Sequence, residues 1–126
     1  MPTRQFPKAV RLLNAREFET VFAARLSASD TWVVVYGIAN DMNHPRLGLM
    51  VSRRIGGAVV RNRWKRLLRE AFRRKQHELP AFDLVCMPRS ATPPPLTQLL
   101  TSLTSLANRI RQQLEHRQRR DGGRPV

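Results

Sequence analysis

The residues best suited to chemistry in this chain are basic, and they gather between Arg53 and Lys75. This stretch holds ten Lys and Arg residues and a single acid, Glu70. Six of the eight basic residues from Arg61 onward are arginines, whose planar guanidinium can hold a phosphate through two hydrogen bonds and can also stack on a base. The stretch therefore indicates phosphate binding.

The spacing of apolar residues in the same stretch predicts a helix from about Ala58 to His77, which Pro80 stops. On a helical wheel one face is apolar, made of Val60, Trp64, Leu67, Leu68 and Ala71. The opposite face carries Asn62, Lys65, Arg66, Arg69 and Arg73, with Arg61 and Arg63 at its two edges. A solvated surface without a partner is the alternative. On such a surface the basic residues would be balanced by acids three or four positions away along the helix, and Glu70 is the only acid present.

The whole chain is strongly basic, which calls for a polyanionic partner. Its 126 residues include 23 Lys and Arg against nine Asp and Glu, a formal charge of +14. Nucleic acid and an anionic membrane both fit this charge. The longest uninterrupted apolar run, Trp32 to Tyr36, is far shorter than the roughly 20 residues of a membrane-spanning helix. The first residues also lack the apolar core of a secretory signal. We expect a cytoplasmic protein that binds nucleic acid.

Catalytic residues are not apparent, and we predict neither a catalytic set nor a metal site in the protein itself. A metal-dependent nuclease needs several carboxylates gathered around its ions, and the nine acids here show no paired arrangement such as Asp-x-Asp. The three histidines are scattered, and Gly56-Gly57 lacks the spacing of a phosphate-binding loop. Cys86 lies inside the apolar run from Phe82 to Met87, so a buried strand residue is favoured over a nucleophile.

The remaining pattern predicts an α+β fold. A short helix begins at Ala15 with Asn14 as its cap, and residues 82–87 form a strand. Residues 32–38 and 46–52 are strands that we interpret as an antiparallel hairpin, because residues 40–45 have turn chemistry. Leucines from Leu96 to Leu114 recur at helical spacing. We expect one RNA-binding domain over residues 1–116 and a basic, disordered tail over residues 117–126.

At this point the sequence resembles a known family. The run from Arg46 to Phe72 is similar to the signature of bacterial ribonuclease P proteins, and its centre, Arg61-Asn62-Arg63, matches their RNR motif. Lys65, Arg66 and Arg69 match further motif positions, and Ser52-Arg53-Arg54 matches a small residue followed by two basic ones. The resemblance, which covers roughly residues 10 to 115, implies that Arg53, Arg54 and the basic face of the helix contact RNA.

The resemblance also implies the fold and the partners. It implies a two-layer α/β sandwich, ribosomal protein S5 domain 2-like, with a mixed sheet of about four strands, three helices and a left-handed βαβ crossover. It implies a subunit that binds ribonuclease P RNA, with 1:1 stoichiometry, and precursor tRNA. The RNA subunit would cleave the phosphodiester bond with Mg²⁺ bound mainly by that RNA. The protein alone would be inactive.

Aromatic residues outside the basic helix gain a role from the resemblance. Phe18, Phe22 and Tyr36 would line a cleft for the single-stranded 5′ leader, and stacking on bases is the physical reason for exposed aromatic rings. From the spacing alone, core positions are favoured for Phe18 and Phe22. The sequence departs from the family at Met50, where a small polar residue is common. The rival functions are a ribosomal or other architectural RNA-binding protein and a metal-dependent nuclease that acts alone.

Overall fold

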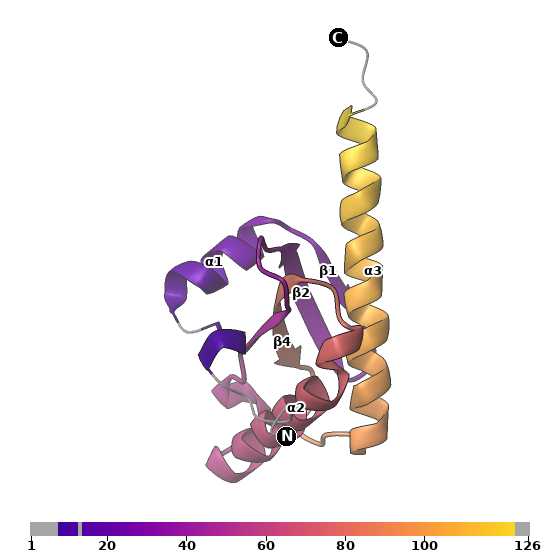
Figure 1. Ribbon diagram of the computed structural model, residues 1–126. Coiled ribbons are helices and arrows are strands. Elements are labelled where there is room, and N and C mark those ends of the chain that lie inside the picture. Colours follow the sequence, from indigo (N-terminus) through magenta and orange to yellow (C-terminus); the bar gives the residue numbers. More distant parts are fainter. Residues whose placement is uncertain (1–7, 13, 123–126) are drawn as a thin grey trace.

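The computed structural model describes residues 8–12 and 14–122 of the chain (Figure 1). Its helices and strands follow one another as α1 (Ala15–Ala23), β1 (Ser27–Ser29), β2 (Val33–Ala39), β3 (Arg46–Leu49), α2 (Ala58–Lys75), β4 (Phe82–Pro88) and α3 (Leu96–Gly122). Three short 3-10 helices, η1 (Lys8–Val10), η2 (Arg53–Ile55) and η3 (Gln76–Glu78), complete the elements of these residues. The predicted α+β class, with a mixed four-stranded sheet and three helices, is confirmed.

The strand order corrects one sequence prediction. The order is β1-β2-β4-β3, with β4 antiparallel to β2 and parallel to β3. The strands at 32–38 and 46–52 therefore do not form a hairpin, because β4 lies between them. The connection from β3 through α2 to β4 is the predicted βαβ crossover, and its left-handedness remains an implication of the resemblance.

The physical reason for the missed hairpin lies in β4. All residues from Phe82 to Cys86 are buried, so this strand is covered on both faces and belongs in the middle of the sheet. The turn between β2 and β3 passes over the end of β4, where Asn40 Nδ2 donates to Asp83 Oδ1 at 2.9 Å. Turn chemistry at residues 40–45 was therefore correct, but a local signal cannot reveal a strand that is inserted later in the chain.

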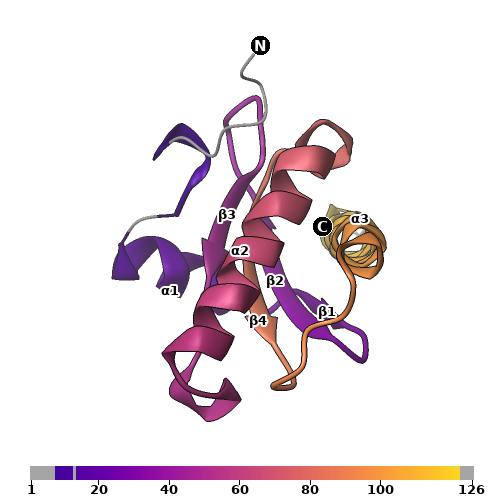
Figure 2. The same cartoon turned by 90° about the horizontal axis from the view of Figure 1, so that it is seen from below.

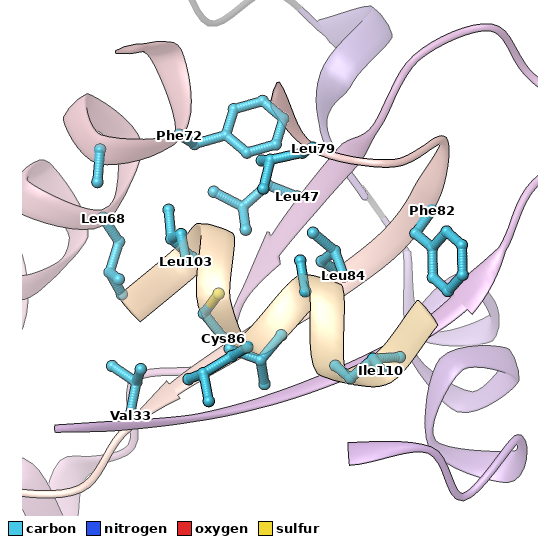
Figure 3. Close-up of a cluster of buried hydrophobic side chains, with 14 of the residues drawn as sticks. Val33, Leu47, Leu68, Phe72, Leu79, Phe82, Leu84, Cys86, Leu103 and Ile110 are labelled. Carbon is cyan, nitrogen blue, oxygen red and sulfur yellow. The ribbon is translucent and has the colours of Figure 1, made fainter. Parts of the chain in front are cut away.

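The two faces of the sheet are covered differently. α2 and α3 pack against one face and enclose the main core with residues such as Phe72, Leu84, Cys86 and Leu103 (Figures 2 and 3). Burial raises the pKa of the Cys86 thiol to about 12, as expected of an inert strand residue. α1 lies on the opposite face, over a smaller cluster that includes Val85. Neighbouring residues of β4 thus serve two different layers.

The last helix is longer than predicted. α3 continues to Gly122, so residues 117–122 are helical where we expected a disordered tail, and residues 123–126 lie outside the described residues. Side chains of α3 reach the sheet edge, where Arg109 donates to Ser29 O and Gln113 donates to Ser27 O. These bonds explain β1, a short polar strand that the sequence did not reveal. In the described part of the chain, no helix is long and apolar enough to cross a membrane.

Candidate nucleic-acid interface

The predicted basic helix has the predicted orientation. In α2, the side chains of Trp64, Leu68, Ala71 and Phe72 are buried against the sheet and α3. Trp64 also donates its indole N–H to the carbonyl oxygen of Ser90 at 2.9 Å, which fixes the rotation of the helix about its axis. Val60 and Leu67 lie at the margin of this apolar stripe and are half-buried. The polar face of α2 therefore points away from the core.

This polar face forms one basic surface, which we call the basic rail: Asn62, Lys65, Arg66, Arg69 and Arg73. Asn62, Arg66 and Arg69 are exposed, whereas Lys65 and Arg73 are half-buried. Together with Glu70 these side chains line a shallow hollow along the helix. Arg63 is exposed at the edge of the rail. Several cations around a hollow favour a polyanion, because each phosphate can contact more than one of them.

Two of the predicted RNA-contacting residues, Arg61 and Arg73, also bind other residues of the protein. Arg73 and Arg74 both form ion pairs with Glu70, at 2.8 Å in the case of Arg74 Nε. The hydrogen bond from Arg74 lowers the pKa of Glu70 most, the bond from Arg73 adds to it, and burial opposes both. Arg61 Nε donates to the carbonyl oxygen of Gly56 at 3.2 Å. Arg61 therefore helps to hold the turn that leads into α2.

That turn carries the other two predicted RNA contacts. Arg53 and Arg54 are exposed on η2, immediately before α2. Gly56 follows with φ of 154°, a region that side chains rarely adopt, and a Cβ there would lie 3.0 Å from Val60 Cβ. Glycine is thus required at the entrance to the helix. The structure brings Arg53 and Arg54 to the N-terminal end of α2 but does not place them on the rail.

The three predicted leader contacts lie together on the other face of the sheet, and we call Phe18, Phe22 and Tyr36 the aromatic patch. The rings of Phe22 and Tyr36 meet edge to face, with their centroids 4.9 Å apart. All three side chains are half-buried and pack against Leu12, Val21 and Val85. Phe18 and Phe22 line a groove, whereas Tyr36 is not among its lining residues, so the leader-contact role stays a prediction.

The register of the sheet places the aromatic patch across the strands. Tyr36 of β2 is opposite Val85 of β4, and Val85 is opposite Gly48 of β3. A Cβ on Gly48 would lie 2.7 Å from Phe18 Cζ, so Phe18 rests directly on the backbone of β3. Because Phe22 contacts Tyr36, helix α1 crosses the sheet from β3 toward β2. The glycine of the Leu47-Gly48-Leu49 segment makes this close approach possible.

An ion-pair network that the sequence reasoning missed holds α1 in place. Arg46 forms two hydrogen bonds to the Asp83 carboxylate, at 2.8 and 2.7 Å, and a third to Glu17 Oε2 at 3.0 Å. The bond to Asp83 raises the pKa of Arg46, although burial opposes it. Glu17 also accepts from the backbone N–H of Asn14, whose side chain caps α1 as predicted. In the sequence, the only hint of this network was a charged residue near the start of each of two strands, Arg46 in β3 and Asp83 in β4.

The basic rail and the aromatic patch are connected by a continuous hollowed surface. One groove is lined by Phe18, Phe22, Leu49 and Met50, so Met50 belongs to the cleft wall and is 36% exposed. A second groove shares Phe18 and Leu49 with the first and shares Lys65 and Arg69 with the hollow on α2. A single strand of nucleic acid could therefore lie on aromatic rings at one end and on cations at the other.

Four of the nine carboxylates are engaged in ion pairs. Glu17, Glu70, Glu78 and Asp83 each form an ion pair with Lys or Arg. Within residues 8–12 and 14–122, no three His, Cys, Asp or Glu side chains gather closely enough to hold a metal ion. The cations of the rail and the half-buried rings of the patch suit binding of phosphates and bases.

Comparison with known proteins gives one consistent result. The family model described as ribonuclease P matches residues 6–111. The ribonuclease P protein component of Methylococcus capsulatus is 46% identical over 86 residues, which are 68% of this chain and 67% of that protein. The component of Proteus mirabilis is 44% identical over 67% of this chain and 71% of its own length.

Solved structures agree with the sequence relatives. The RNase P protein of Staphylococcus aureus superimposes with a TM-score of 0.69 and 32% identity, covering 79% of this chain and 93% of that one. The protein of Thermotoga maritima gives 0.68 and 33%, covering 75% and 92%. The match includes the basic rail, the aromatic patch and the whole sheet within residues 6–111. With relatives of this identity and a shared fold, the chain belongs to the ribonuclease P protein family.

Proposed function

We propose that this chain is the protein subunit that binds the catalytic RNA of ribonuclease P and the 5′ leader of precursor tRNA, and so assists removal of the leader during tRNA maturation. The observation that carries the proposal is the shared lining of the grooves. Phe18 and Leu49 join the aromatic patch to the middle groove, and Lys65 and Arg69 join that groove to the basic rail.

The two ends of this surface suit different parts of RNA. The rail offers cations at neighbouring helical turns, which match the phosphates of a folded RNA and lower their repulsion. The aromatic patch offers rings with one open side, which can stack on bases of any sequence. Leaders differ in sequence from one precursor to the next, so a sequence-tolerant platform fits them. We assign RNA docking to Arg61, Arg63 and the rail, and leader contact to Phe18, Phe22 and Tyr36.

Cleavage itself we assign to the RNA subunit. Mg²⁺ supplies the Lewis acid and the activated water of phosphodiester hydrolysis when it is bound there. The protein's own carboxylates suit this role poorly, because Glu17, Glu70 and Asp83 already pair with arginines. The contribution of the protein is to screen phosphates and to hold the leader. We expect one protein for each RNA subunit, acting in the cytoplasm where precursor tRNA is made.

A ribosomal or other architectural RNA-binding protein is the alternative. It would share the basic rail, but it would not need rings that stay half-open beside the rail. The aromatic patch therefore favours the ribonuclease P function.

The test is cleavage of precursor tRNA by the protein alone, by a cognate catalytic RNA alone and by both together at low Mg²⁺. We expect no cleavage by the protein alone, little by the RNA, and efficient cleavage by the complex. Leader removal by protein in the rigorous absence of RNA would contradict the assignment of catalysis. Equal rates for the RNA with and without protein would favour the architectural alternative.

A further inference from the structure

The C-terminal part of α3 is a second basic surface, separate from the rail. Figure 1 shows the last turns of this helix extending beyond the sheet, at the end of the molecule away from α2, while its first turns lie beside α2. All residues from Glu115 to Arg120 are exposed, and residues 109–120 contain five arginines and one acid. The family match ends at residue 111, so this part of the helix lies outside it. An exposed helix end with this charge favours a polyanionic partner.

The arginines of α3 divide between two faces. Arg109 donates to Ser29 O at 3.3 Å, Gln113 to Ser27 O at 2.7 Å and Arg117 to Ala24 O at 2.8 Å. These residues are four apart, so they mark the face of α3 that looks toward β1 and the end of α1. Arg120 follows on the same face, one turn beyond the last contact. Measured from the middle of this face, Arg111 and Arg119 lie about 160° and about 120° away on a helical wheel, which places them on the opposite side of α3.

The aromatic patch leads toward this face. Across the sheet, Gly48, Val85, Tyr36 and Ser27 form one row from β3 to β1. Phe18 rests on Gly48 and Phe22 on Tyr36, so the patch advances along the row toward β1. Just beyond Phe22, α1 ends at Ala23. The carbonyl oxygen of the next residue, Ala24, accepts a hydrogen bond from Arg117. A strand that leaves the rail and crosses the patch therefore continues toward Arg117 and Arg120.

Arg25 adds a third cation at this point. It follows α1 with φ of 57°, the left-handed conformation in which helices usually place glycine. Arg25 is exposed, and it directly follows Ala24, whose carbonyl oxygen accepts the hydrogen bond from Arg117. Side chains at positions that favour glycine gather at functional sites, because the strain must be offset by another gain.

We propose that Arg25, Arg117 and Arg120 bind the phosphate backbone of the 5′ leader where it leaves the aromatic patch. The inference rests on the proposed function, and it extends the leader path past the sheet edge onto α3. Guanidinium groups without neighbouring aromatic rings suit phosphates better than bases, so this contact is insensitive to leader sequence. Longer leaders gain affinity from it, and leaders that end on the patch do not.

The test uses the holoenzyme assembled with its cognate catalytic RNA and precursor tRNAs whose leaders are shortened one nucleotide at a time. The double variant Arg117→Ala/Arg120→Ala is compared with Arg111→Ala/Arg119→Ala, which removes the same charge from the opposite face. Counterion release from single strands predicts roughly a fivefold loss of affinity per lost phosphate contact near 0.1 M salt. We expect this loss for long leaders only, and parent-like binding of every precursor by the opposite-face variant.

Further measurements keep the inference falsifiable. Arg117→Ala also removes the bond to Ala24, so Arg120→Ala alone must show part of the same leader-length effect while melting like the parent. Weaker binding of the catalytic RNA by the double variant, in the absence of tRNA, would overturn the leader assignment. So would equal losses in the two double variants. If Phe22→Ala binds long-leader and mature tRNA with unchanged affinities, the proposed leader cleft itself fails, and that result is distinct from a failure confined to α3.

Discussion

The basic rail on α2 and the aromatic patch beneath α1 are two parts of one surface, but they are attached to the fold differently. The rail stands on a helix whose opposite face has a buried centre, and three of its five side chains are exposed to solvent. The rings of the patch are themselves part of a packed cluster with Leu12, Val21 and Val85. Removing an exposed rail side chain such as Arg66 therefore changes binding alone, whereas removing a ring changes binding and stability together.

The difference also concerns what holds each part in position. α2 is anchored by its own apolar stripe and by the Trp64 bond to Ser90. α1 has only nine residues and one fully buried side chain, Val21, so it depends on the polar network around Arg46. The ion pairs of Arg46 with Glu17 and Asp83 therefore hold Phe18 and Phe22 in position.

The largest effect is expected for Arg46→Met. Loss of the guanidinium leaves the buried Asp83 carboxylate without its ion-pair partner and frees the first turn of α1 from Glu17. We expect a loss of about 2–4 kcal/mol in the free energy of unfolding, measured in urea. Arg66→Met, the same substitution on the rail, is the control and should unfold like the parent. Similar stabilities for both variants would contradict the contrast between the two regions.

Phe22→Ala should give a smaller and mixed effect. The ring is half-buried and packs on Tyr36, so we expect about 1–2 kcal/mol of lost stability, less than the roughly 3–5 kcal/mol of a fully buried Phe. Affinity for precursor tRNA should fall by about 1–3 kcal/mol per lost base contact, and affinity for mature tRNA should stay nearly unchanged. Equal weakening for both tRNAs would return Phe22 to the core.

Substitutions on the rail side should act on binding alone. Arg63→Ala or Arg66→Ala should each lower the slope of log affinity for the RNA subunit against log salt by about one unit. Thermal melting should stay close to that of the parent, because both side chains are exposed. A salt titration of each variant measures the slope. Parent-like affinity and slope in both would mean that the face is merely solvated.

The sequence predicted those features that depend on local pattern. Helical spacing identified α2 and its polar face, and the Asn14 cap located the start of α1. The apolar run predicted a strand with Cys86 buried in it, whereas the burial of the acid Asp83 within that strand was not predicted. The sequence did not predict the insertion of β4 between β2 and β3, because strand order depends on contacts between residues 37 to 55 positions apart.

The candidate site was predicted with a similar limit. Residue types identified the rail. The family resemblance supplied Phe18, Phe22 and Tyr36, since the spacing of the two phenylalanines alone favoured core positions. The network of Arg46, Glu17 and Asp83 was missed because its members are separated in the chain and each has an ordinary surface pattern. The helical course of residues 117–122 was missed because no apolar residue between Leu114 and Gly122 continues the helical spacing.

The smallest effect is expected for Glu70, the one acid that lines the hollow together with the rail. It pairs with Arg73 and Arg74, and so competes with phosphates for both. Its pKa is lowered in the folded protein, so its ion pairs stabilise the fold above the pKa of the unfolded carboxyl, and this contribution is lost as pH falls through the folded value.

Glu70→Gln should remove that loss of stability at acid pH and shift the unfolding free energy at neutral pH by less than about 1 kcal/mol. It should also tighten binding of the RNA subunit a few-fold. Urea unfolding at several pH values and a salt titration check both effects. Glu78→Gln, which removes the Lys75 pair off the rail, is the matched control. A tighter complex for both variants would show that net charge alone matters, and the competition at Glu70 would then have no role.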